Sequence, residues 1–208
     1  MAALVRTVRQ VTGKPYIANG CGMLRGSRGS GYYANRELAD PVIAEVDGVL
    51  PEGFIRWSSN TYWRSVDDWK KDLEFLDMLN RMGKITVAWA LVKETVPTGA
   101  TKDQVAMYGY ATYLMAKSGG QAYFTARGYD DNFLTVTKID LGYPIEEYQS
   151  LNGGPVHERE FSKALVLLNP SDNSFTITLE KSYLTLDGLK VSEIDLAAHT
   201  GLILLKID

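Results

Sequence analysis

The chain has 208 residues, of which 45% are apolar and 11% aromatic, enough for one large domain or one and a half ordinary ones and too apolar for a disordered protein. Its net charge is −3 and it has no cluster of lysine and arginine, which argues against binding to nucleic acid or to a membrane surface. It has one cysteine (Cys21), two widely separated histidines and no apolar run near the roughly 18 residues that span a bilayer, so we expect no intrachain disulfide, no metal site and no membrane span.

The N-terminal part alternates between helices and short apolar strands. Apolar residues at helical spacing predict a helix over 2–12, and the sequence KPYIAN predicts a strand over 14–19. The glycine-rich stretch 20–31 has neither a G-x-G-x-x-G nor a Walker A pattern, so we expect a mobile loop there and not a nucleotide site. A short helix over 35–45 and a strand over 46–50 complete this stretch.

Two further helices have clear end signals. Ser65 precedes an acidic first turn, which predicts the N-cap of a helix that Gly83 ends. Thr101 and Gln104 have the spacing of a capping box, which predicts a second helix that runs to residue 118.

The strand pattern predicts a parallel sheet. Residues 84–91 (KITVAWAL) are nearly all apolar, as in strands buried on both faces, and residues 121–127 form another strand. This alternation indicates an α/β fold with four strands, about half of a (β/α)8 barrel, which typically takes about 250 residues. The chain also starts in a helix that no strand precedes, so we expect it to be the C-terminal part of a longer protein.

From about residue 152 the pattern changes to antiparallel β structure. The β-rich runs cover 158–168, 174–186 and 191–206, with turn sequences at 169–173 and 187–188 between them. Phe175, Ile177 and Leu179 alternate with polar residues, which predicts one dry and one wet face. We therefore expect an α/β body over residues 1–150 and a small antiparallel, β-sandwich-like domain over residues 151–208.

The segment Val46–Trp57 (VDGVLPEGFIRW) gives the strongest functional signal. Pro51 cannot donate to a strand ladder, so the strand ends there and Glu52 lies just past its C-terminal end. In α/β proteins with repeated strand–helix units, that end binds ligands and holds the chemistry. A carboxylate at this place, with Trp57 and Trp63 close behind, indicates an acid that acts on sugars; the alternative is a solvated loop glutamate.

Several segments together resemble a known family. They are KPYIANG (14–20), DGVLPEGFIRW (47–57), ATYLMAKSGGQAYF (111–124), LGYPIEEY (141–148), HEREFSKALVLLNPS (157–171) and HTGLILLK (199–206). In this order they resemble the C-terminal half of glycosyl-hydrolase-like family 15, inferred glycoside hydrolases with a TIM-barrel catalytic domain and a small C-terminal β domain. The chain has Ser162-Lys163-Ala164 where the family usually has a glycine, which concerns a turn in the β domain.

The resemblance implies an incomplete (β/α)8 barrel that hydrolyses a glycan without a metal or an organic cofactor. The four strands would be the fifth to the eighth, and a missing N-terminal half or self-association would supply the rest. Glu52 would follow the sixth strand as general acid or nucleophile, and carbohydrate would be the partner. The alternatives are a non-catalytic carbohydrate-binding protein and an incomplete gene product without a stable fold of its own. The resemblance is compatible with secretion, but we see no signal peptide in this sequence, so the localisation is left open.

Glycoside hydrolysis usually needs a second carboxyl group. Glu94 and Asp130 are the candidates, since each follows a strand at its C-terminal end; a loop charge and a turn or cap residue are the alternatives. Asp47 lies near the start of its strand and faces away from Glu52, so we expect it to make a structural hydrogen bond.

Other residues at the same end are candidates for sugar binding. Aromatic rings could stack on sugar rings and polar side chains could bind hydroxyls, which gives Trp57, Trp63 and Tyr129 for stacking, and Asn19 and Arg127 for hydrogen bonding. The mid-strand Trp89 is more typical of barrel filling. We expect His157 and His199 to lie on the surface or at an interface of the β domain.

Overall fold

The computed structural model describes residues 2–19, 35–56, 60–92, 95–119, 121–128 and 135–207. In the N-terminal part the elements are α1 (Ala2–Thr12), β1 (Ile17–Asn19), α3 (Arg36–Glu45), β2 (Gly48–Leu50), α4 (Val66–Arg81), β3 (Ile85–Leu91), α5 (Lys102–Ala116) and β4 (Ala122–Arg127). The predicted strand–helix alternation is therefore confirmed. The predicted glycine-rich loop at 20–31 lies outside the described residues.

The first sheet is parallel and has four strands in the order β1-β2-β3-β4. Each strand is added next to the previous one, so right-handed crossovers place all the connecting helices on one face, as in a barrel and unlike a doubly wound sheet. Within the described residues no barrel closes, because β1 and β4 each pair along one edge only.

The two faces of this sheet differ in burial. Ala18, Val49 and Ala88 lie on the helix-covered face and are at most 7% exposed. On the other face, which we call the open face, Ile17 is 43% and Tyr123 55% exposed. β3 alternates accordingly, with its odd-numbered residues 85, 87 and 89 only partly buried. The prediction that this strand is buried on both faces is wrong, because no second layer covers the open face within the described residues.

The predicted caps of α4 and α5 are confirmed in part. The Ser65 hydroxyl accepts a hydrogen bond from the Asp68 N–H at 3.2 Å, and the Thr101 hydroxyl accepts one from the Gln104 N–H at 3.1 Å. The Gln104 amide does not complete the predicted capping box, since it donates to the carbonyl oxygens of Ala198 (3.1 Å) and the residue after it (3.3 Å). α5 ends at residue 116, two residues earlier than predicted.

The second sheet is antiparallel, with six strands in the order β5-β6-β7-β10-β8-β9. Its elements are β5 (Gln149–Ser150), the 3-10 helix η1 (Leu151–Gly153), β6 (His157–Glu160), β7 (Ala164–Asn169), β8 (Phe175–Leu184), β9 (Lys190–Leu196) and β10 (Thr200–Lys206). Two of the predicted β runs are each divided into two strands, at residues 161–163 and 197–199. The first division falls at the turn where the chain departs from the family pattern.

The antiparallel part encloses a small core of its own. The β8–β9 hairpin meets β10 through only two residue pairs, at Leu184 and Tyr183, and then separates from it. Leu167, Ile177 and Leu204 from three different strands form one buried cluster. The predicted sandwich-like packing is therefore present only in part, since the six strands belong to a single hydrogen-bonded sheet.

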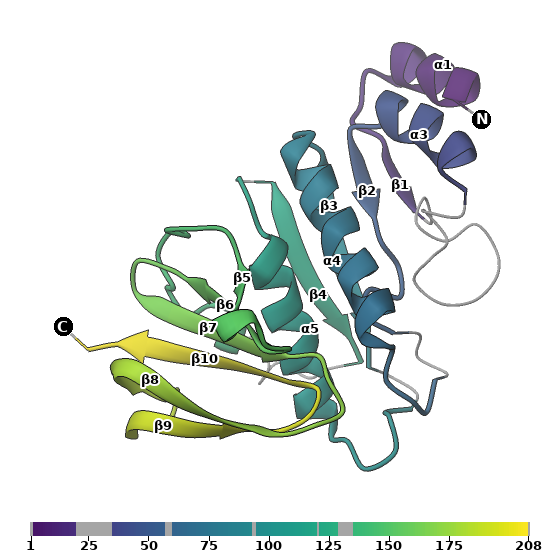
Figure 1. Cartoon of the computed structure of the whole chain (residues 1–208). Helices are drawn as coiled ribbons and strands as arrows, with labels where there is room; N and C mark the ends of the chain where they lie inside the picture. Colours follow the sequence, from purple (N-terminus) through teal and green to yellow (C-terminus); the bar gives the residue numbers. More distant parts are fainter. Residues whose placement is uncertain are drawn as a thin grey trace.

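Helix α5 lies between the two sheets (Figure 1). It packs against β3 and β4 on one side and against β7 and β10 on the other, so 11 of its 15 residues are buried. Gly201 of β10 allows this close approach, because a Cβ there would lie 2.7 Å from the Met107 carbonyl oxygen and 2.4 Å from the Ala111 Cβ. One buried cluster includes residues from α5 and from both sheets.

Candidate functional site

Glu52 lies at the C-terminal end of β2, as the sequence predicts. After Pro51 the chain turns tightly, and the Glu52 N–H donates to the Leu50 carbonyl oxygen at 3.0 Å. Glu52 then forms an isolated parallel bridge with Trp89 of β3. Residues paired in this way point to the same side, so the Glu52 side chain lies on the open face of the sheet.

Asn19 holds the Glu52 carboxylate in place. It ends β1, and its Nδ2 donates a hydrogen bond to Glu52 Oε2 at 3.0 Å. Asn19 is exposed and Glu52 is partly buried. Two residues predicted to belong to the site from separate strands therefore meet, and one carboxylate oxygen has a fixed donor. No ion pair to Glu52 occurs among the described residues.

Trp89 lies beside Glu52, and the sequence pattern alone does not show that the two are neighbours. Its mid-strand place is typical of barrel filling, and its partly buried position on the open face, next to the carboxylate, is compatible with that interpretation. The parallel register of β2 and β3 decides this, and a sequence does not give register between separate strands.

Trp63 packs at the junction between the two sheets. Its ring stacks on His199 with centroids 4.8 Å apart at 15°, and meets Tyr108 edge-on at 5.1 Å. His199 is 6% exposed, and its Nε2 lies 2.8 Å from an Asp172 carboxylate oxygen. One ring face of Trp63 is thus covered, and the prediction of an interface position for His199 is confirmed. His157 likewise packs against Trp69, at 4.9 Å.

The other predicted site residues are not described. Trp57, Glu94, Tyr129 and Asp130 lie outside the described residues. Arg127 ends β4 opposite Leu91, and its side chain is not described. The catalytic roles of Glu52 and of a second acid therefore stay predictions.

The turn after Glu52 is buried and strained. Ile55 is 1% exposed and has φ of 64°, a conformation that β-branched residues rarely adopt and that costs on the order of 1–3 kcal/mol. Its N–H donates to Asp72 Oδ2 at 3.1 Å. Arg64 donates from Nη2 to the Gly53 carbonyl oxygen at 2.7 Å and forms a buried ion pair with Asp72. Burial raises the pKa of Asp72 to about 6, although Arg64 acts in the opposite direction.

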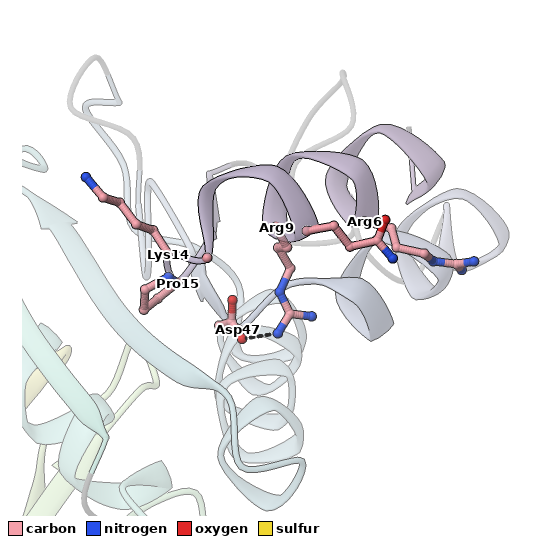
Figure 2. A pocket seen from close by; sticks show the side chains of 7 residues that line it. Arg6, Arg9, Lys14, Pro15 and Asp47 are labelled. Atoms are coloured by element: carbon pink, nitrogen blue, oxygen red, sulfur yellow. Dashed lines mark hydrogen bonds and ion pairs between the residues drawn. The ribbon is translucent and has the colours of Figure 1, made fainter.

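A cavity of about 480 Å³ lies at the opposite end of the sheet, beside α1 (Figure 2). Arg9 Nη2 lies 2.5 Å from Asp47 Oδ1, and the second Asp47 oxygen accepts the Tyr16 N–H at 2.8 Å. Arg6 pairs with Glu45. These ion pairs tie α1 to the end of α3 and to the start of β2, so the predicted structural role of Asp47 is confirmed and the Arg9–Asp47 pair forms part of the cavity wall.

The described ranges contain no candidate for a membrane-spanning helix and no candidate for a metal site. None of the helices in these ranges is long and apolar enough to cross a membrane. Nor do three or more potential metal-ligating side chains gather anywhere in the same part of the chain.

The fold is similar to that of carbohydrate-active enzymes of known structure. The whole chain aligns with the cyclomaltodextrin glucanotransferase CldA, which has a three-domain ABC distribution, at a TM-score of 0.50 and 12% identity, and covers 53% of that protein. It also aligns with a γ-CGTase from alkalophilic Bacillus clarkii (TM-score 0.47, 14% identity, 100% of this chain and 38% of that one). A pullulanase from Anoxybacillus sp. LM18-11, complexed with maltotetraose, aligns at a TM-score of 0.48 and 7% identity (99% of this chain, 41% of that one).

The chain thus spans about half, or less, of the length of these solved proteins. No known family profile and no curated protein sequence matches it. The alignment with CldA therefore shows a shared fold alone, and the resemblance to family 15 rests on the sequence motifs.

Proposed function

We propose that the chain is half of a glycoside hydrolase barrel with its C-terminal β domain, related to glycosyl-hydrolase-like family 15, and that it acts on an oligo- or polysaccharide. The observation that supports this most directly is the position of Glu52. Its carboxylate lies at the C-terminal end of a parallel strand, on the open face, held by Asn19 and adjacent to Trp89. In this arrangement Glu52 is a general acid or a nucleophile.

The open sheet supports the barrel part of the proposal. Its helices lie on one face and both of its edges are unpaired within the described residues, so four more parallel strands would close it. An N-terminal half or self-association would supply these strands. The open face, with Glu52 at one end of it, would then line the barrel interior.

The chemistry requires a partner for Glu52. One carboxyl group protonates the leaving oxygen and the other acts as base or nucleophile, and their separation decides between inversion and retention. Glu94 and Asp130, which follow β3 and β4, are the candidates within this chain, and the missing half is the other source. Trp89 adds an aromatic surface for a sugar ring to the candidates Trp57, Trp63 and Tyr129, with Arg127 as a hydroxyl donor site.

A matched pair of variants tests the role of Glu52. Wild type, Glu52→Gln and Glu45→Gln are incubated with soluble starch, pullulan, xylan and mixed-linkage β-glucan, and reducing ends are measured. We expect Glu52→Gln to lose about 10²-fold or more of the turnover, because it cannot transfer a proton or attack. Glu45, at the opposite end of the sheet, is paired with Arg6, so Glu45→Gln should retain turnover. Equal turnover of wild type and Glu52→Gln would remove Glu52 from the mechanism.

A second candidate is a non-catalytic carbohydrate-binding protein. The hydrogen-bond partner that the structure gives Glu52 within the described residues is the amide of Asn19 and not a second acid. In this case the wild type hydrolyses none of the four polysaccharides but binds maltotetraose or one of the polymers in affinity electrophoresis. Trp89→Ala then weakens binding while Glu52→Gln retains it.

A further inference from the structure

The turn that follows Glu52, residues 53–56, is fixed by contacts from outside itself. Two of its residues, Gly53 and Ile55, have positive φ, of 71° and 64°. Glycine adopts this conformation readily, whereas isoleucine does so only when its surroundings determine it. The turn therefore depends on whatever contacts hold Ile55.

Asp72 makes such a contact with Ile55, and Arg64 makes one with Gly53. Asp72, on α4, accepts the N–H of Ile55, and Arg64, two residues before α4, donates to the carbonyl oxygen of Gly53. The two side chains also pair with each other, and they are only 6% (Arg64) and 14% (Asp72) exposed. A buried, charge-assisted pair of this kind has a defined geometry, because the guanidinium donates in a rigid fork.

The contacts act on the residues next to Glu52. Gly53 is its neighbour in the chain, and the backbone of Glu52 itself is bridged to Trp89 on one side. The direction of the Glu52 side chain depends on the backbone between these two anchors. A change in the turn would move the carboxylate away from its hydrogen bond with Asn19.

We propose that Arg64 and Asp72 are positioning residues for Glu52: they hold the turn at residues 53–56 and so aim the carboxylate along the open face beside Asn19. This inference rests on the proposed role of Glu52. It adds two residues that, within the described part of the chain, do not contact the carboxylate itself. If the pair were purely structural, its loss would destabilise the fold but would not move the Glu52 carboxylate.

The chain contains a matched control for this distinction. Asp47 also accepts one backbone N–H and pairs with one arginine, but at the opposite end of β2. Asp72→Asn and Asp47→Asn therefore remove the same kind of charge, one from beside the turn that follows β2 and the other from just before β2. Both should lower the unfolding midpoint, and only Asp72→Asn should affect the site.

The test is NMR on the full chain. The readouts are the side-chain amide resonances of Asn19 and the ¹³C titration of the Glu52 carboxyl carbon. We expect Asp72→Asn to shift both, because the Asn19–Glu52 hydrogen bond changes, and Asp47→Asn to shift neither. Unchanged resonances in a folded Asp72→Asn protein, or equal shifts in both variants, would overturn the inference.

Arg64→Lys serves if Asp72→Asn does not fold. Lysine keeps the positive charge opposite Asp72 but lacks the fork that also reaches the Gly53 carbonyl oxygen. We expect smaller shifts of the same Asn19 and Glu52 signals. Signals identical to wild type would contradict the positioning role.

Kinetics separate this inference from the proposed function. On a polysaccharide that the wild type hydrolyses, Asp72→Asn should lower kcat by about 10²-fold with KM unchanged, as expected for a misplaced reacting group. If Glu52→Gln retains turnover while Asp72→Asn still shifts the Glu52 signals, the positioning stands and the proposed function fails. If Glu52→Gln is inactive and the signals stay fixed in Asp72→Asn, the function stands and the positioning fails.

Discussion

Asp72 is buried next to several ionisable groups, and its protonation should therefore affect stability. Desolvation raises its pKa from the ordinary 3.8 to about 6, while Arg64 and the Ile55 N–H favour the charged form and Asp68 disfavours it. Tyr108 lies close enough for Asp72 to raise its pKa as well. The folded protein thus binds the Asp72 proton more tightly than the unfolded chain does.

As a consequence, the contribution of Asp72 to the free energy of unfolding decreases as the pH rises. The contribution of Asp72 is full below its unfolded pKa, near 3.8, and is lost as the pH rises through about 6. Between about pH 4 and about pH 7 we expect the free energy of unfolding of wild type to fall, relative to Asp72→Asn, by on the order of 1–3 kcal/mol. Urea denaturation across this range measures it, and parallel curves for the two proteins would contradict the prediction.

For single residues, the sequence predicts the place of a residue relative to a strand end better than its backbone conformation. Glu52 could be placed because Pro51 ends the strand locally. The left-handed conformation of Ile55 could not be predicted, since an isoleucine disfavours it and the groups that hold it, Arg64 and Asp72, follow later in the chain. The position of Trp89 beside Glu52 depends on the register between strands, which is also a non-local property.

Among the elements, the sequence predicts where a helix starts but not which elements pack against it. Ser65 and Thr101 cap α4 and α5 as expected, because capping needs only residues within one turn. Gln104 was expected to complete a capping box, but its amide binds the loop before β10, 94 residues away. α5 has no polar stripe to show which sides are covered, because both sheets bury it.

The end of α5 is held by an arginine from the antiparallel sheet. Arg159 Nη1 donates to the carbonyl oxygens of Leu114 (2.8 Å), Met115 (2.7 Å) and Lys117 (2.8 Å). Carbonyl groups in the last turn of a helix have no partner within the helix, and a cation there also interacts favourably with the helix dipole. One side chain of β6 thus completes the C-terminus of α5.

We expect Arg159→Met to lower the free energy of unfolding by about 2–4 kcal/mol, because buried carbonyl groups lose charged hydrogen bonds. Chemical denaturation gives this value. The control is Arg81→Met: Arg81 makes two ion pairs, but it is 54% exposed and solvent screens its pairs, so its replacement should cost much less. Equal losses in the two variants would mean that Arg159 does not cap the helix.

In the whole molecule, the two sheets share a core that the sequence pattern does not reveal. The change of pattern near residue 150 predicts one domain over 1–150 and another over 151–208. Yet the largest buried cluster contains Tyr108 and Leu114 of α5 together with Val166 and Ile203 of the antiparallel sheet. Trp63 and His199 add an aromatic contact across the same junction. These contacts favour a single cooperative unit in the described part of the chain.

Deletion of residues 149–208 tests this. The truncated chain would expose the face of α5 that packs on β7 and β10 and would leave the α5 carbonyl groups without Arg159. We therefore expect residues 1–148 alone to lack a cooperative unfolding transition, whereas the full chain should show one transition, coincident by tryptophan fluorescence and by far-UV circular dichroism. Two separate transitions of the full chain, or a truncated chain that unfolds cooperatively, would show instead that the two predicted domains fold independently and that α5 needs no second sheet.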